Sequence, residues 1–182
     1  MRLLFMAITA IFVNFSVYAD ANIPDLINKH KQPELYCMAQ NIYFEAGTES
    51  HMGKVAVALV TLTRVRDNRF PNSICEVVKQ GPIRESWKTR QDPNLSDDQR
   101  VYYPVRNRCQ FSWYCDGKDD IPTVGLGWRQ AQEVAILTYV LGQYQGLLEG
   151  ATHYHADYVN PTWNKTKTLV TQIDRHIFYR WD

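Results

Sequence analysis

Two apolar stretches with helical spacing lie next to each other in the first third of the chain. Residues 35–46 repeat apolar side chains three and four positions apart, and residues 52–65 are rich in alanine and valine. Apolar residues at this period predict helices that bury a face against a core. Gly47, Thr48 and Ser50 interrupt the pattern, so we expect two core helices with a break between them, the second largely buried.

The rest of the chain predicts one more long helix and a little strand. We expect Ser73 to cap a short helix that ends at Val78. The further expected elements are a helix over residues 128–148 that Gly150 ends, a strand over 110–114, an extended segment over 152–159, and strands over 168–173 and 176–179. The chain has 182 residues, so we expect an α+β fold: one helix-rich domain with a small β-sheet.

Residues 81–108 differ in character from their surroundings. The segment is polar and carries three prolines, Pro82, Pro93 and Pro104. We interpret it as a long loop or insertion. Long loops in compact domains are often lids or binding loops, and a tolerated surface insertion explains the pattern equally well.

The first residues have the pattern of a secretory signal peptide. Arg2 precedes an apolar run over residues 3–17, and small residues near Ala19 suit cleavage. The run is shorter than the ~20 residues that a membrane span needs, which disfavours an anchor. We therefore expect a signal peptide over 1–19, a linker over 20–34, and an exported protein, periplasmic or secreted, with no stable membrane anchor.

Charge and cysteine content exclude some classes of protein. The net charge is +1, which does not suit a nucleic-acid partner. Four cysteines in an exported chain favour disulfides, with three pairings open: Cys37, Cys75, Cys109 and Cys115. The sequence has no C-x-x-C pair, so we expect no structural zinc site.

Glu45 is the candidate for acid–base chemistry. It comes near the end of the first expected helix, between Tyr43-Phe44 and Ala46. Apolar neighbours disfavour the charged carboxylate and raise its pKa, so such a group can protonate a glycosidic oxygen. A solvated glutamate at a helix end is the alternative. Glu49 is a candidate second carboxylate, or a group that binds backbone N–H at the next helix.

His153, Tyr154 and His155 form a second polar group. Alternate residues of a strand share a face, so the two imidazoles could hold a metal with Asp157 as a third ligand. We favour substrate contact from a cleft wall, and we expect no metal and no cofactor.

Several segments together resemble the SleB-type cell wall hydrolases, the family of spore-cortex lytic enzymes. The resemblance begins with Cys37-Met-Ala-Gln-Asn-Ile-Tyr-Phe-Glu-Ala and Glu49 and continues in order over about 125 residues, to Trp163. Its further blocks are Gly53-Lys-Val-Ala-Val-Ala-Leu-Val, Thr63-Arg-Val-Arg, Arg69-Phe-Pro-Asn-Ser-Ile-Cys-Glu-Val-Val-Lys-Gln, Cys109-Gln-Phe-Ser-Trp-Tyr-Cys-Asp-Gly and Gly150-Ala-Thr-His-Tyr-His-Ala-Asp-Tyr-Val-Asn-Pro-Thr-Trp.

The resemblance implies a fold related to lysozymes and lytic transglycosylases, with a catalytic domain over residues 35–182. It implies that Glu45 is the general acid/base and that the substrate is the glycan strand of peptidoglycan. The substrate-binding candidates are Tyr43, Glu49, Gln110, Phe111, Ser112, Thr152, His153, Tyr154 and His155. Because residues 110–112 are expected to form cleft wall, we favour a Cys75–Cys115 disulfide, with Cys37 and Cys109 left as the second candidate pair. One departure is that Gly47-Thr48 replaces the family's Arg-Gly.

The expected reaction is cleavage between N-acetylmuramic acid and N-acetylglucosamine by a monomer, as a lytic transglycosylase with one glutamate. Hydrolysis as in a muramidase would need a second carboxylate, such as Glu49, Asp116 or Asp157. Further alternatives are an amidase with Cys37 as nucleophile and His153 or His155 as base, a metal-dependent amidase, and a peptidoglycan-binding module without activity.

Overall fold

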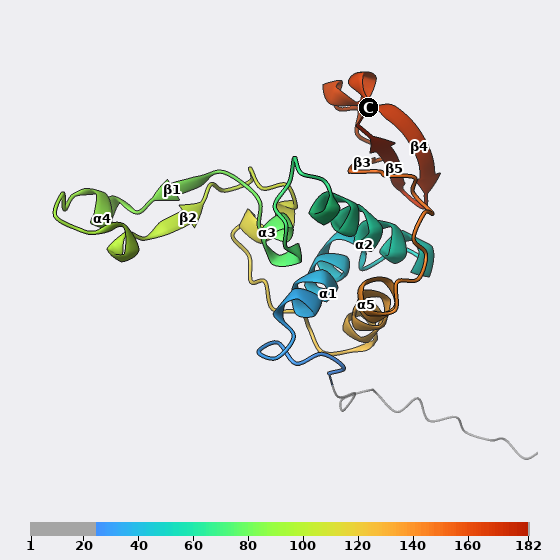
Figure 1. Ribbon diagram of the computed structural model, residues 1–182, viewed down its shortest axis with the longest axis horizontal. Helices are drawn as coiled ribbons and strands as arrows, with labels where there is room; N and C mark the ends of the chain where they lie inside the picture. Colours follow the sequence, from blue (N-terminus) through green and yellow to red (C-terminus); the bar gives the residue numbers. More distant parts are fainter. Residues whose placement is uncertain (1–24, 182) are drawn as a thin grey trace, which may run out of the picture.

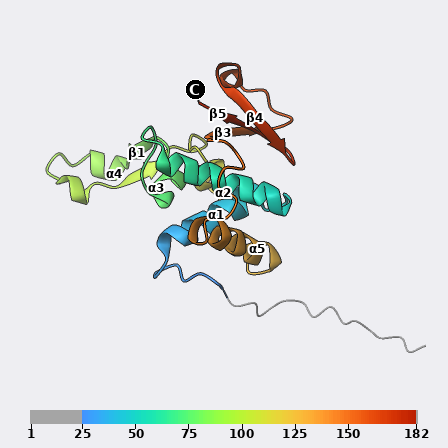
Figure 2. The same cartoon turned by 45° about the vertical axis from the view of Figure 1, so that its right-hand side comes forward.

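Helices form the body of the protein, and α1 lies at its centre. The computed structural model describes residues 25–181, so the expected signal peptide lies outside the described residues. The body consists of α1 (Pro33–Ala46), α2 (His51–Arg66), α3 (Ile74–Val78) and α5 (Leu126–Ala135). Helix α1 packs against the other three, and Figures 1 and 2 show it between α2 and α5.

The two apolar stretches at the start of the chain form the expected core helices. In α1 the side chains of Met38 and Ile42 are fully buried. In α2 every residue from Gly53 to Leu62 is buried, which confirms the prediction of a largely buried helix. Residues 47–50 separate the helices, and the Ser50 side chain accepts a hydrogen bond from the Gly53 N–H, 3.3 Å away. This cap satisfies a donor at the start of α2.

Three antiparallel strands form a small sheet beside α2 in the order β3-β5-β4. They are β3 (His153–Ala156), β4 (Thr168–Ile173) and β5 (His176–Arg180), which confirms the predicted extended segments. The turn between β4 and β5 is attached to the start of α2, because the Asp174 carboxylate accepts the Ser50 N–H at 2.9 Å. Helix and sheet together give the expected α+β class.

The segment 81–108 folds into an arm that extends from the body (Figure 1). Its strands β1 (Ile83–Glu85) and β2 (Tyr102–Pro104) pair antiparallel, and between them lie α4 (Trp87–Arg90) and the 3-10 turn η1 (Asp97–Gln99). The Val105 N–H donates to the Pro82 carbonyl at 2.8 Å and closes the base of the arm. The interpretation as an insertion suits this shape, although the segment is ordered rather than a plain loop.

The strand expected over residues 110–114 is wrong. Phe111 is buried, and Ser112–Cys115 forms a 3-10 turn, η2. A disulfide joins Cys109 to Cys115 and holds their Cα atoms 6.0 Å apart. Six extended residues would span ~20 Å, so this ring forces the segment to turn.

The helix expected over residues 128–148 is shorter than predicted. Helix α5 ends at Ala135, a π-helical turn, η3 (Ile136–Val140), follows, and residues 141–150 are turns. The Thr138 hydroxyl donates to the Val134 carbonyl at 2.8 Å, an internal bond that competes with regular helix. Gly142 and Tyr144 have φ of 62° and 64°, which no right-handed helix allows, so Gly142 rather than Gly150 marks the end.

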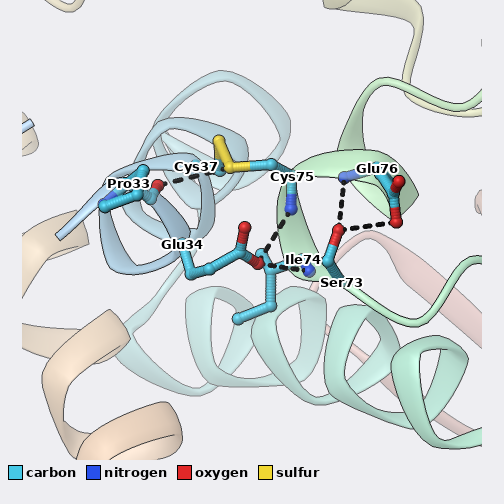
Figure 3. The surroundings of a disulfide bond; sticks show 7 residues. All are labelled: Pro33, Glu34, Cys37, Ser73, Ile74, Cys75 and Glu76. Carbon is cyan, nitrogen blue, oxygen red and sulfur yellow. Dashed lines mark hydrogen bonds between the residues drawn. A yellow bond between two sulfur atoms is a disulfide. The ribbon is translucent and has the colours of Figure 1, made fainter. Parts of the chain in front are cut away.

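The favoured Cys75–Cys115 disulfide is also wrong. The structure pairs Cys37 with Cys75 and Cys109 with Cys115. Cys37 lies on α1 and Cys75 on α3, and these helices pack together (Figure 3). The Glu34 carboxylate strengthens the contact by accepting the N–H groups of Ile74 at 2.6 Å and Cys75 at 3.2 Å. The packing of α3 on α1 therefore decided the pairing.

Part of the expected linker is packed against the body. Ile27 is 3% exposed, and its N–H donates to the Gln132 side chain on α5. The Asp25 carboxylate accepts the indole N–H of Trp128 at 2.7 Å. Within residues 25–181 no helix has the length and apolar character to cross a bilayer.

Candidate active site

The Glu45 carboxylate lies where α1 meets the sheet. Its Oε2 accepts a hydrogen bond from the Tyr154 hydroxyl on β3 at 2.8 Å. Burial raises the pKa of Glu45, whereas the Tyr154 hydroxyl, the Arg64 charge and the Ser112 backbone N–H lower it. The net direction is upward, so Glu45 keeps its proton closer to neutral pH than an exposed glutamate does.

Tyr154 and Arg64 form the immediate surroundings of this carboxyl. Burial and the neighbouring Glu45 raise the pKa of Tyr154 well above its usual value, so the phenol stays protonated and can donate. Arg64 is 4% exposed, and its Nε donates to the Thr152 carbonyl at 2.7 Å. Its guanidinium lies 5.0 Å from the ring centroid of Phe111. A guanidinium cannot lose its proton in a protein, so Arg64 is a fixed positive charge near Glu45.

A cavity of about 590 Å³ opens beside Glu45. We call it the Glu45 cavity; it is lined by Phe44, Glu45, Ser112, Trp113, Asp116, Lys118, Asp119, Asp120, Tyr154, Ala156, Tyr158 and His176. Its walls combine aromatic rings with carboxylates. Aromatic faces and hydrogen-bonding groups together suit a polar, ring-shaped ligand such as a sugar.

Trp113 is held in the wall of this cavity by a buried polar chain. Its indole N–H donates to Asn41 at 2.9 Å, and the Asn41 amide donates to the Thr61 hydroxyl at 3.1 Å. Phe44 stacks on the Trp113 ring with centroids 4.8 Å apart. Because Asn41 and Thr61 are both fully buried, α1 and α2 fix the orientation of the indole.

Some expected site residues lie with Glu45 and some lie behind it. Ser112 and Tyr154 line the Glu45 cavity. Phe111 and Thr152 are each 1% exposed and pack in the interior, where both contact Arg64. These two support the surroundings of Glu45 and do not line the cavity.

The two histidines of β3 lie on the opposite face of the strand from Tyr154. His153 packs against Trp163 and Trp181, with centroids 5.5 and 5.2 Å away. The His155 ring stacks on Tyr179 at 5.3 Å. Side chains of a strand alternate between faces, so a strand that presents Tyr154 to Glu45 turns both imidazoles away.

Three other expected residues lie apart from the Glu45 cavity. The Tyr43 hydroxyl accepts the Thr123 N–H, and its ring packs on Trp128. Glu49 accepts the Arg175 N–H at 3.3 Å and borders a different cavity. Gln110 is exposed, and its N–H donates to the Gln80 carbonyl at 2.8 Å.

Reasoning from the sequence did not select most of the acidic residues at the rim of this cavity. Asp116, Asp119 and Asp120 follow the Cys109–Cys115 ring, and of these only Asp116 had been considered. A hydrogen bond from the Lys118 backbone lowers the pKa of Asp116, whereas burial and the other two aspartates raise that of Asp120. The signal in the sequence was three aspartates within the five residues after Cys115; the ring that positions them was not predicted.

The structure does not bring the alternative nucleophiles and ligands together. All four cysteines are in disulfides, so Cys37 has no free thiol. Among residues 25–181, no group of three or more His, Cys, Asp and Glu side chains is arranged to hold a metal ion.

Comparison with solved structures places the fold. The chain is similar to the catalytic domain of a germination-specific lytic transglycosylase, SleB, from Bacillus anthracis, with a TM-score of 0.55 and 22% identity over 87% of this chain and 100% of that domain. It is also similar to the catalytic domain of the Bacillus cereus SleB protein, with a TM-score of 0.53 and 23% identity over 90% of this chain and 99% of that chain. At these identities the likeness shows the fold, and it confirms the expected helix-rich fold with a small β-sheet.

Sequence comparison gives the family. Two spore cortex-lytic enzymes from Bacillus cereus are each 39% identical to this chain over 57 residues, which is 31% of this chain and 21% of each relative. The chain thus matches about a fifth of the length of these curated relatives. The Cell Wall Hydrolase family matches residues 48–179, a range that begins just after Glu45. Because this match spans more than half of the sequence, the chain belongs to the Cell Wall Hydrolase family.

Proposed function

We propose that the protein cleaves the glycan strand of peptidoglycan between N-acetylmuramic acid and N-acetylglucosamine, with Glu45 as the single general acid/base. One observation carries the proposal: a carboxyl with a raised pKa opens into a cavity with aromatic walls. Membership of the Cell Wall Hydrolase family and the SleB-like fold support it. Peptidoglycan lies outside the cytoplasm, so the same reasoning supports export of the chain.

The chemistry that we propose for Glu45 is a lytic transglycosylase reaction. The protonated carboxyl first gives its proton to the glycosidic oxygen, and the bond from that oxygen to the muramic acid C1 breaks. The resulting carboxylate then takes the proton from the C6 hydroxyl of the same sugar, and the C6 oxygen bonds to C1. The product is a 1,6-anhydro sugar, no water is consumed, and Glu45 ends protonated as it began.

The surroundings of Glu45 suit both halves of this cycle. Burial favours the protonated acid, while the Tyr154 hydroxyl and the Arg64 charge stabilise the carboxylate that forms next. The aspartates of the cavity place negative charge near the sugar, where positive charge develops as the bond to C1 breaks. A group that must both give and accept a proton works best when neither form is strongly favoured.

Hydrolysis by a muramidase route is the second candidate. The observation in its favour is that Asp116, Asp119 and Asp120 line the same cavity as Glu45 and could supply a second carboxylate. Mass spectrometry of digested peptidoglycan separates the two routes. Anhydro-muramic ends support the lytic transglycosylase, and reducing muramic ends in their place contradict it.

The amidase alternatives have less support. The Cys37 thiol that one of them needs is in a disulfide, and the imidazoles of His153 and His155 contact aromatic rings on the far face of β3.

The role of Glu45 is tested with Glu45→Gln, which keeps the shape of the side chain and removes its acidic proton. We expect the release of soluble fragments from purified peptidoglycan to fall ~10²–10⁴-fold, with binding to insoluble walls retained. Glu133→Gln, a change on the exposed side of α5, is the matched control and should cleave as the wild type does. A Glu45→Gln protein with wild-type activity would contradict the proposal. A wild-type protein that binds walls without cleaving them would favour the alternative of a binding module without activity.

A further inference from the structure

A second cavity, of about 360 Å³, adjoins the Glu45 cavity. We call it the lysine cavity; it is lined by Lys29, His30, Pro33, Tyr36, Cys37, Gln40, Cys75, Lys79, Trp113, Tyr114 and Asp120. Trp113 and Asp120 line both cavities and form part of the boundary between them. The two cavities therefore share part of their walls at these two residues.

A disulfide and a hydrogen bond cross-link parts of the wall of the lysine cavity. The Cys37–Cys75 disulfide forms part of the wall and ties α1 to α3 (Figure 3). The Gln40 amide donates to the Asp120 carbonyl at 2.6 Å and fixes the border with the Glu45 cavity. Such cross-links lower the entropy cost of ordering a site around its ligand.

The charges of this cavity favour an anionic ligand. Lys29 and Lys79 are exposed, and neither makes an ion pair with a carboxylate within residues 25–181. The Lys29 ammonium lies 5.3 Å from the centroid of the Tyr36 ring, which holds the charge at the cavity. Asp120 is the one acidic residue of the lining, against two lysines and a histidine.

We infer that the lysine cavity binds carboxylates of a peptide stem. The stem is the one attached to a muramic acid of the glycan strand that lies in the Glu45 cavity. This inference rests on the proposed function and adds its substrate class: glycan strands that still bear peptides. A peptide stem branches from the sugar chain and carries several carboxylates. The juxtaposed cavities match these two parts, an aromatic-walled cavity with the acid/base for the sugars and a lysine-bearing one for the peptide.

The test compares two substrates prepared from one batch of peptidoglycan: glycan strands with their peptide stems, and the same strands after an amidase has removed the stems. The measured quantity is the ratio of kcat/KM for the stem-bearing strands to kcat/KM for the stem-free strands. We expect the wild type to prefer stem-bearing strands about tenfold, the scale of one or two charge-assisted hydrogen bonds at exposed sites. The preference should shrink as salt is added, because salt screens exposed charges.

The variant Lys29→Gln/Lys79→Gln should bring this ratio close to one, whereas Lys29→Arg/Lys79→Arg should keep the preference. Lys31→Gln is the matched control, because this exposed lysine of the same segment does not line the lysine cavity. A wild-type ratio near one, or a ratio that survives in the glutamine variant, overturns the inference and leaves the proposed function standing. A wild-type protein that cleaves neither substrate overturns both.

Discussion

At the scale of single residues, the protein balances two opposite demands on Glu45. Burial alone would hold the carboxyl protonated, and exposure alone would hold it ionised. The Tyr154 hydroxyl at 2.8 Å and the buried charge of Arg64 offset part of the effect of burial. Arg64 on α2 thus places a fixed cation near Glu45, although no cation follows Glu45 directly in the chain, where Ala46, Gly47 and Thr48 stand.

Tyr154→Phe should raise the pKa of Glu45, because the phenol stabilises the carboxylate. The acid of the first step must be protonated, so activity falls as pH rises through this pKa. The alkaline limb of the pH–rate profile should therefore move to higher pH in the variant. Measuring kcat/KM against pH for wild type, Tyr154→Phe and the exposed control Tyr139→Phe checks this, and an unmoved limb would show that the hydrogen bond does not tune Glu45.

His153→Gln should make the fold less sensitive to acid. Burial, with Arg64, Lys167 and Arg69 nearby, lowers the pKa of His153 from 6.5 to about 4. Unfolding lets this imidazole take up a proton between those values, so stability is lost as pH falls from about 6.5 to about 4. Urea unfolding at pH 7 and pH 4.5 should show a smaller loss in the variant. Equal losses of unfolding free energy in both proteins would mean that His153 does not contribute to the loss of stability in acid.

At the scale of elements, the arm over residues 81–108 is the part that depends least on the body. Its strands pair with each other, and the ion pair between Arg100 and Glu85, at 2.8 Å, lies within it. No arm residue lines the Glu45 cavity. An element that closes on itself at its base behaves as an insertion whose length has a small effect on loop entropy.

Replacing residues 83–104 by two glycines should leave the body folded and active. The Pro82 and Val105 backbones already meet at 2.8 Å, so a short turn can join them without moving α3. We expect a thermal midpoint within ~4 °C of the wild type, which corresponds to a change of up to about 1 kcal/mol, and unchanged cleavage of peptidoglycan. Loss of cleavage in a shortened protein that still unfolds cooperatively would instead show that the arm holds the polymer.

At the scale of the whole molecule, the two disulfides act on loops of very different length. Cys37–Cys75 spans 38 residues and joins two helices of the core, whereas Cys109–Cys115 spans 6 residues beside the Glu45 cavity. In the chain-entropy account, a cross-link stabilises a fold more when it closes a longer loop in the unfolded chain. The long bridge should therefore dominate global stability.

Cys37→Ser/Cys75→Ser should destabilise the protein by about 4 kcal/mol, and Cys109→Ser/Cys115→Ser by about 2 kcal/mol. The second pair should have the larger effect on activity, because its ring sets the position of Ser112 and Trp113. Chemical unfolding of both double variants checks which bridge contributes more to stability, and peptidoglycan cleavage checks which contributes more to activity. A larger loss of stability from the short bridge would contradict the entropy argument.

The sequence alone determined the parts of this protein that depend on neighbours along the chain. The helical period of residues 35–46 and 52–65, the Ser73 cap and the strands over 168–173 and 176–179 could be predicted because local pattern and final structure agree. The resemblance to the SleB-type family, rather than local pattern, chose Glu45 on the first helix and Tyr154 on the strand, and it did not show that their side chains meet. It failed at residues 110–114 and 136–148, where a cysteine ring and left-handed backbone override local preference.

Only the tertiary structure decided the disulfide pairing, the face of β3 that meets Glu45, and the place of the charged groups around it. Cys37 pairs with Cys75 because α3 packs on α1, and no spacing along the chain encodes that contact. Arg64 reaches the surroundings of Glu45 because α1 and α2 pack side by side. Contacts between distant segments follow from how whole helices and sheets bury their apolar faces. A local pattern shows that a face is apolar, but it does not determine which element packs against it.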